Sequence, residues 1–232
     1  MVFVQQGMKI CKIETMGWKN AITGMRYPMN SELQSDSLVD SSILVKLGDK
    51  DLDLMKRLAK AGTDHSKFLR MIHVSASVKM PFSWWKQFDT YKIATTAISR
   101  STMHRGVGKE LLTRDDFYTE QWREENQYIL DKINDIQQQI LKAEQDKNIK
   151  LKKQLWRRLM DVLPLTLCQE RMIDFNYQVL LNILGSRFQV EKLSQEWDFF
   201  CNAFLTCCPY LKEFYDTTKH KRSLTTEEFK KL

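Results

Sequence analysis

The chain has 232 residues, of which 43% are hydrophobic and 11% aromatic, and its formal net charge is +7. This composition excludes a disordered chain, and no apolar run approaches the roughly 20 residues of a membrane span, so we expect a soluble cytoplasmic protein without a membrane partner. The positive charge predicts an anionic partner, which a nucleotide, a nucleic acid or an acidic surface would satisfy. Because no repeat or linker divides the chain, residues 1–232 are expected to form a single domain.

The N-terminal part of the chain predicts one weak strand and two short helices. Residues 8–14 fit the strand, and residues 16–26 fit a helix that leads into a polar loop through Ser42. Residues 51–61 form an amphipathic pattern, and Gly62 follows where a helix commonly ends on a left-handed residue.

Residues 72–80 show the clearest periodicity in the chain. Apolar and polar side chains alternate there, as in a strand with one packed and one wet face. Pro81 then ends the strand and presets the backbone for a helix, which we expect over residues 82–92. The next segment, residues 93–105, is rich in hydroxyl side chains and arginines, and we expect it to form an anion-binding loop.

Residues 93–105 offer the groups that a phosphate monoester requires. Short hydroxyl donors and forked guanidinium groups satisfy phosphate oxygens at fixed geometry. The candidates are Ser99, Arg100, Ser101, Thr102, His104 and Arg105. A solvated turn with surface arginines explains the same composition, so that alternative stays open.

The second half of the chain is predicted to be helical. Isoleucines at spacings of three, four and seven mark one long helix from Tyr118 onward, and a second helix runs back to Pro164. We interpret this helical hairpin, residues 117–163, as an oligomer arm, with an ordinary packed pair as the alternative. Two further helices are expected, over residues 167–184 and about 190–206.

The five cysteines form no C-x-x-C pair and are odd in number. This spacing predicts neither a zinc site nor a disulfide framework, so we expect no metal and reduced thiols. Cys207 and Cys208 end an apolar stretch just before Pro209, and we interpret them as packing side chains.

Taken together, these segments resemble the flavin-dependent thymidylate synthase family from Met16 to about Tyr215. Residues 62–68 lie where the family has the stretch H-x-T-P-x-E-H, with Ser66 at the Thr position. The family signature R-H-R-x-x-S falls on residues 90–95 and is eroded, because only a basic third residue and a final hydroxyl remain.

The resemblance extends into a second block of the chain. An ungapped run from Val162 through Asn176 and Asn182 to Arg187 is similar to a conserved block of the family. Glu170 stands where the family has a nucleotide-binding arginine, with Arg171 next to it.

The resemblance implies an α+β fold, a mixed α/β core with a long helical hairpin, assembled as a homotetramer whose active sites draw on several subunits. It implies transfer of one carbon from methylene-tetrahydrofolate to C5 of dUMP, with FAD as cofactor, reduction by FADH2 and NADPH as a further co-substrate. No metal takes part.

The resemblance also assigns roles to individual residues. Arg187 is the implied catalytic residue, because a fixed guanidinium stabilises a uracil deprotonated at N3. The implied flavin-binding residues are Ser66, Thr90, Tyr91, Lys92, Asn176 and Asn182. The implied substrate-binding residues are Gln87, Ser101, Arg105 and Arg187. The composition of residues 93–105 adds Ser99, Arg100 and His104 to the substrate site, and Arg171 is added because it is next to Glu170.

Two other functions stay open at this stage. The first is a flavin- and folate-dependent pyrimidine nucleotide hydroxymethylase of the same fold. The second is a non-catalytic basic protein that binds nucleic acid through residues 150–158. We favour a nucleotide over nucleic acid as the partner, because dense basic runs are usually solvated helix faces.

Overall fold

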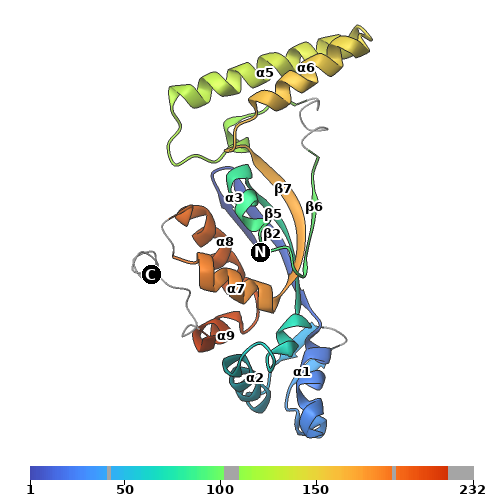
Figure 1. Ribbon diagram of the computed structural model, residues 1–232, viewed down its shortest axis with the longest axis vertical. Coiled ribbons are helices and arrows are strands. Elements are labelled where there is room, and N and C mark those ends of the chain that lie inside the picture. Colours follow the sequence, from blue (N-terminus) through green and yellow to red (C-terminus); the bar gives the residue numbers. More distant parts are fainter. Residues whose placement is uncertain (41–42, 102–109, 190–191, 219–232) are drawn as a thin grey trace.

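The computed structural model describes residues 1–40, 43–101, 110–189 and 192–218 of the chain. Its centre is a five-stranded sheet in the order β1-β2-β5-β7-β6, in which neighbouring strands are antiparallel. The strands are β1 (Val2–Gln5), β2 (Met8–Met16), β5 (His73–Pro81), β6 (Thr95–Ser99) and β7 (Cys168–Asn176). Figure 1 shows the sheet as a tall central layer.

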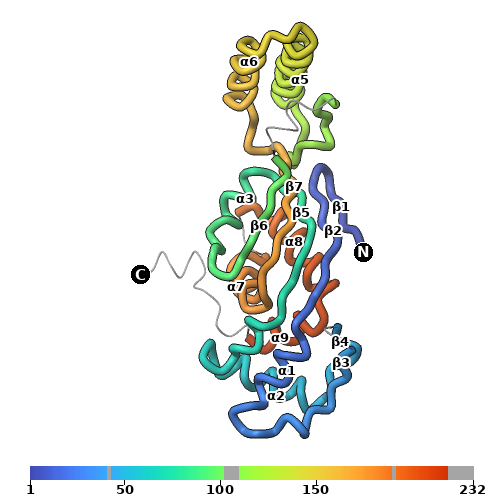
Figure 2. Tube along the Cα trace, turned by 90° about the vertical axis from the view of Figure 1, so that its right-hand side faces the viewer, coloured from blue at the N-terminus to red at the C-terminus, as the bar shows by residue number. Residues whose placement is uncertain are grey.

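Helices cover one face of this sheet, as Figure 1 and Figure 2 show from two sides. The covering helices are α3 (Phe82–Phe88), α7 (Tyr177–Arg187), α8 (Ser194–Cys207) and α9 (Leu211–Thr218). On β5, Val74, Ala76 and Val78 are fully buried in the main core. The alternate residues of β5 are polar and point to the other face, which no helix covers among the described residues.

Aromatic side chains fill the space between the sheet and its helices. Trp84 stacks on Phe88 with ring centroids 5.0 Å apart, and Phe200 of α8 lies 5.1 Å from Trp84. Fully burying a side chain such as Phe contributes about 1.5–3 kcal/mol. This cluster therefore fixes α3 against α8, and with them the residues at the end of α3.

The predicted helical hairpin is confirmed, but its first helix begins at Glu124 and not at Tyr118. Its helices are α5 (Glu124–Gln145) and α6 (Ile149–Val162), which stand together at one end of the sheet (Figure 1). Ile133, Ile136 and Ile140 are fully buried and pack in one cluster with residues of α6. These isoleucines therefore pack within the hairpin itself, as expected if the hairpin is an ordinary packed pair of helices.

The opposite end of the molecule is built from the N-terminal third of the chain. It contains α1 (Trp18–Arg26), β3 (Leu38–Asp40), β4 (Ile43–Lys46) and α2 (Asp49–Ala61), with 3-10 turns at Tyr27–Met29, Glu32–Gln34 and Lys67–Arg70. Gly62 ends α2 with a φ of 113°, as predicted. The small sheet of β3 and β4 lies where the sequence predicted a polar loop.

The helix predicted over residues 167–184 is wrong in its first half. Cys168–Asn176 is strand β7, and the helix begins only at Tyr177. In β7, Ile173 and Phe175 are buried, Met172 before them is exposed, and Asp174 between them is polar. Only the neighbouring strands, distant in sequence, make this segment a strand. The helix also continues beyond the predicted end at residue 184, because Gly185 lies inside α7 (Tyr177–Arg187).

Two further boundaries differ from the prediction. The helix expected over residues 82–92 ends at Phe88. The segment expected to form an anion-binding loop contains an edge strand, Thr95–Ser99, paired with β7. Its β-branched residues suit a strand, and the partner strand fixes it there.

Within the described parts of the chain, no helix combines the length and the apolar character that crossing a membrane requires.

Candidate functional site

Gln87, Tyr91 and Arg187 meet where α3 and α7 end. Gln87 lies in the last turn of α3, Tyr91 follows that helix, and Arg187 is the last residue of α7. Arg187 Nε donates a hydrogen bond to the Tyr91 hydroxyl oxygen at 3.1 Å. Trp197 of α8 joins them, because its indole N–H donates to Gln87 Oε1 at 2.8 Å. We call these four residues the Gln87–Arg187 cluster.

The Arg187 guanidinium is held by aromatic rings as well as by the hydrogen bond. Its Cζ atom lies 5.4 Å from the ring centroid of Trp197 and 5.9 Å from that of Tyr91. The two rings meet edge to face at 6.3 Å. Such cation–π contacts contribute about 0.5–2 kcal/mol. The cation is therefore held in place at the rim of the aromatic core.

Arg171 is a second arginine near the end of α3. Its Nη1 pairs with Asp89 Oδ1 at 2.8 Å, its Nε donates to Gln169 Oε1 at 3.0 Å, and its Cζ lies 4.2 Å above Trp85. Ser99 is directly opposite Arg171 in the β6–β7 ladder. An anion at Arg171 would have to share this guanidinium with the Asp89 carboxylate.

The Arg100 side chain points away from Arg171 and Ser99. Residues opposite each other in an antiparallel ladder share a face, and successive residues alternate. Arg100 follows Ser99 and ion-pairs with Glu170 at 3.2 Å, while Glu170 also accepts from Ser77 on the polar face of β5. The structure therefore separates Arg100 from Arg171 and from the Gln87–Arg187 cluster.

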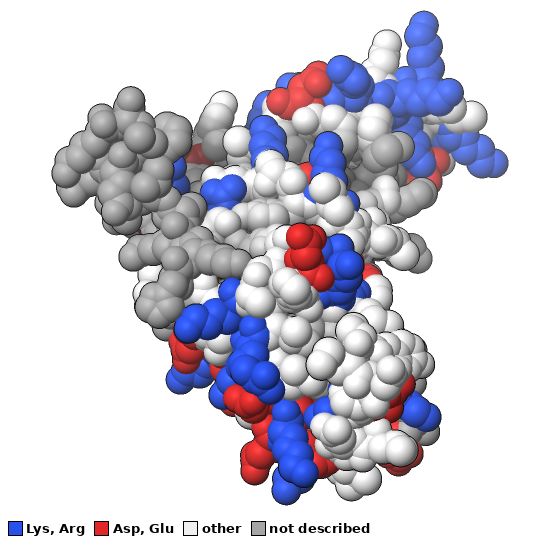
Figure 3. Space-filling view, turned by 60° about the horizontal axis from the view of Figure 1, so that its bottom comes forward, with Lys and Arg blue, Asp and Glu red and all other residues white. Residues whose placement is uncertain are grey.

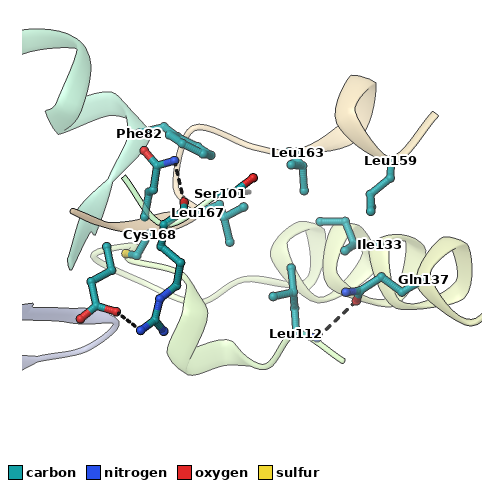
Figure 4. Close-up of a pocket in the computed structure, with 12 residues that line it drawn as sticks. Phe82, Ser101, Leu112, Ile133, Gln137, Leu159, Leu163, Leu167 and Cys168 are labelled. Atoms are coloured by element: carbon teal, nitrogen blue, oxygen red, sulfur yellow. Dashed lines mark hydrogen bonds and ion pairs between the residues drawn. The ribbon is translucent and has the colours of Figure 1, made fainter. Parts of the chain in front are cut away.

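Ser101 lines a pocket where the hairpin meets the sheet (Figure 4). Its apolar walls are Phe82, Leu112, Ile133, Leu159, Leu163 and Leu167. Gln137, almost fully buried, accepts a hydrogen bond from the Leu112 backbone N–H at 3.3 Å. The residues that line this pocket include no member of the Gln87–Arg187 cluster.

Ser66 and Asn182 belong to a separate polar row. Ser66 Oγ donates to Gln178 Oε1 at 3.2 Å, and Gln178 Nε2 donates to Asn182 Oδ1 at 3.1 Å. Asn176 lies at the start of the same helix, where its side chain accepts from the Val179 N–H at 3.0 Å. Asn176 is thus the N-cap of α7. Ser66, Gln178 and Asn182 form what we call the Ser66–Asn182 row.

The row and the cluster lie on different faces of α7. Gln178 and Asn182 are four residues apart and share one face. Arg187 is nine residues beyond Gln178, which corresponds to about 180° around the helix and about 13 Å along it. One copy of the chain therefore presents these two groups in different directions.

The remaining predicted site residues flank Tyr91 or lie outside the described residues. Thr90 Oγ1 donates to the Gln87 carbonyl oxygen at 2.7 Å, so this hydroxyl closes the end of α3. Lys92 is exposed. His104 and Arg105 fall in the segment 102–109, outside the part of the chain that the structure describes.

Two residues of these groups were absent from the sequence prediction. Trp197 was expected only as an apolar residue of a helix, and Gln178 was not singled out. Their contacts reach Gln87 and Ser66, which are 110 and 112 residues away in sequence. No local signal marks such contacts.

Basic side chains are distributed unevenly over the molecule. In Figure 3 they gather toward the hairpin end, while basic and acidic side chains mix at the opposite end. Lys150, Lys153, Arg157 and Arg158 are exposed on α6. Arg157 lies 3.5 Å from Asp161, four residues further along the helix, so part of this charge is offset within α6.

No protein-family model matches the chain, and no curated protein matches it either. Solved structures do match. Thymidylate synthase X (ThyX) of Helicobacter pylori, solved with FAD and dUMP, is 17% identical over 92% of this chain and 100% of its own, with a TM-score of 0.65. The UMP/dUMP methylase PolB of Streptomyces cacaoi, solved with 5-Br dUMP, is 13% identical over 91% and 96% of the two chains, with a TM-score of 0.58.

At these identities the likeness establishes the fold. The chain has the fold of flavin-dependent thymidylate synthases, so the predicted α+β architecture is confirmed. What it binds and catalyses must be argued from its own residues.

Proposed function

We propose that this chain is a flavin-dependent enzyme that methylates C5 of dUMP. The carbon would come from methylene-tetrahydrofolate and the reducing equivalents from FADH2, which NADPH regenerates. The observation that carries the proposal is the Gln87–Arg187 cluster. Three residues that the family resemblance assigned from two distant segments meet there. Hydrogen bonds of 2.8 Å and 3.1 Å join Trp197 to Gln87 and Arg187 to Tyr91, and the contacts of the Trp197 ring with Tyr91 and Arg187 link the two pairs. The fold match with FAD- and dUMP-bound ThyX supports it.

The cluster suits the pyrimidine ring of the nucleotide. Arg187 keeps its positive charge at any working pH, and a nearby cation favours the anionic form of an acidic ring nitrogen. In this role Arg187 stabilises uracil deprotonated at N3, which raises the electron density at C5. The nucleotide phosphate requires further donors, and we propose Arg171 near the end of α3, with Ser99 opposite it in the ladder, for this role.

The Ser66–Asn182 row suits a flavin. Flavin presents ring and ribityl groups that both donate and accept hydrogen bonds, and the row offers a hydroxyl and two amides on neighbouring elements. Tyr91 of a second copy would offer an aromatic face, and the exposed Lys92 of that copy a charge for the cofactor phosphates. When bound, reduced flavin supplies the hydride that completes the methyl group. The chain's own residues orient the cofactor and stabilise the negative charge of the deprotonated uracil.

We propose that the working enzyme is a homotetramer with shared sites. The row and the cluster face different directions from α7, so a flavin held by one copy reaches the uracil held by a second copy more readily than that of its own chain. The polar face of the sheet, with exposed Met172 and Ile98, is available for such packing. The isoleucine stripe of the hairpin does not support this assembly, because it is buried within the chain.

A tritium-release assay tests the proposed reaction. The protein is incubated with FAD, NADPH, methylene-tetrahydrofolate and dUMP labelled with tritium at C5. We expect tritium to enter the water in step with dTMP formation. A hydroxymethylated product would point to the alternative chemistry of the same fold. Absence of tritium release with all four components, under conditions where flavin is bound, would refute the proposed activity.

A further inference from the structure

We infer that Trp197 is a specificity-determining positioning residue, which sets the Gln87 amide so that the cluster accepts a uracil nucleotide and rejects a cytosine nucleotide. This inference rests on the proposed function and goes beyond it, because it names a residue outside the predicted site and the base that the site discriminates against. Trp197 itself is fully buried, so it acts through Gln87 and Arg187.

The orientation of Gln87 follows from the chemistry of its partner. An indole N–H only donates, so the atom that meets it at 2.8 Å must be the amide oxygen. An amide placed the other way would bring two donors together. The Gln87 NH2 group is therefore directed away from Trp197, and among the described residues no hydrogen bond occupies it.

The other members of the cluster also present donors. Tyr91 uses its oxygen to accept from Arg187 Nε, which leaves the phenol O–H free to donate. Arg187 uses only Nε among the described residues, so its two Nη groups remain as donors. The cluster thus offers N–H and O–H groups from three side chains, while Gln87 Oε1 and the Tyr91 oxygen each already accept one hydrogen bond from within the cluster.

Such a donor set distinguishes the two pyrimidines. Uracil presents O2 and O4 as acceptors, and N3 becomes a third when it loses its proton. Cytosine presents an amine at C4, whose N–H groups would face these donors. A polar group left without a partner in a desolvated site reduces affinity about 5- to 150-fold. We expect the parent protein to bind dUMP more tightly than dCMP, by a factor within or above that range.

Trp197→Phe tests this inference directly. The substitution keeps an aromatic ring under Arg187 but removes the N–H that orients Gln87. Without it the amide can turn its oxygen toward the base, where it accepts from the cytosine amine. The dissociation constants of dUMP and dCMP are measured by calorimetry on the FAD-loaded protein. We expect the dUMP preference to shrink about 10-fold, with FAD affinity unchanged.

Trp18→Phe is the matched control. Trp18 is also fully buried and its indole N–H donates to Thr15 at 3.3 Å, yet it packs on Tyr177 and Tyr210, away from the cluster. We expect this variant to lose stability without changing the preference for dUMP. If both variants changed the preference for dUMP over dCMP equally, the effect would come from a general loss of stability, and the inference would be overturned.

Gln87→Glu provides a second test if Trp197→Phe does not fold. The carboxylate still accepts from the indole but has no donor to offer the base, so dUMP affinity should fall more than dCMP affinity. A parent protein that binds FAD and dUMP, with an unchanged dUMP preference in the Gln87→Glu or folded Trp197→Phe protein, would overturn this inference alone. A parent that binds neither nucleotide would overturn the proposed function and this inference with it.

Discussion

Arg187 Nε donates to the hydroxyl oxygen of Tyr91 at 3.1 Å, although the two residues are 96 positions apart in sequence. The contact ties the last residue of α7 to the turn that follows α3. Tyr91 stands where the family signature has a histidine, and Arg187 stands where its second block has the arginine assigned to uracil. In this chain the contact therefore joins a residue predicted to bind the flavin to the residue predicted to bind the nucleotide.

Replacing Arg187 with alanine should abolish turnover and weaken dUMP binding. Losing a charge-assisted partner from a desolvated site typically costs about 2–5 kcal/mol. Folding should survive, because the side chain lies at the rim of the core. Arg57→Ala is the control, since Arg57 is an exposed arginine that pairs with Asp53 on α2. Normal turnover by the Arg187→Ala protein would remove Arg187 from the site.

Tyr91 and Lys92 should each contribute to flavin affinity. A phenol packs against a ring system such as isoalloxazine, and Lys92 meets a phosphate as a point charge without the fork of an arginine. FAD is titrated into the flavin-free parent, Tyr91→Ala and Lys92→Ala proteins. Both substitutions should weaken binding, and the loss at Lys92 should shrink as salt rises. Equal affinity in all three proteins would leave this segment a purely structural turn.

Light scattering should give a mass of about four times the 27.5 kDa of one chain. The reason is the opposite orientation of the Ser66–Asn182 row and the Gln87–Arg187 cluster around α7. If the tetramer brings them together, Asn182→Ala and Arg187→Ala proteins mixed as subunits should recover part of the activity. A monomer at micromolar concentration would contradict the shared site.

Stability should depend on pH through Glu196. This carboxyl is buried, and burial, together with the charge of Glu120, raises its pKa above the usual value. The folded state therefore holds its proton more tightly than the unfolded chain does. As pH rises from the unfolded pKa through the folded one, the unfolded chain loses this proton first and stability falls.

Glu196→Gln removes that loss. Its melting temperature should exceed that of the parent near pH 8 and approach it near pH 4, where the parent carboxyl is protonated in both states. The exposed Glu125 is the control position, and Glu125→Gln should leave the pH profile unchanged. A Glu196→Gln protein that is less stable than the parent at both pH values would mean that the carboxylate makes a favourable contact in the folded state.

The sequence predicted those elements whose signal is local. β5 alternates along its own length, and the hairpin repeats its isoleucines every three or four residues. β7 and β6 were not predicted, because polar residues occur on both faces of these strands, as Arg171 and Asp174 do on β7, and only the neighbouring strands of the ladder make them strands. For β7, the apolar run that continues into α7 also favoured a single long helix.

The candidate site was likewise predicted only in part. Family resemblance alone placed Gln87, Tyr91 and Arg187 in one site, and the structure brings them together. The composition of residues 93–105 added Arg100, which the alternation of side chains along the edge strand turns to the other face of the sheet. Trp197 was missed because an indole in an apolar helix predicts packing, and its hydrogen bond to Gln87 depends on how α8 lies against α3.

The absorbance spectrum of the purified protein tests the central claim most directly. FAD is added to the protein and unbound cofactor is removed, after which dUMP is titrated and the visible flavin bands are followed. The account predicts that the protein retains FAD and that dUMP shifts these bands, with a much weaker response in the Arg187→Ala protein. A parent protein that remains colourless after incubation with FAD would contradict it.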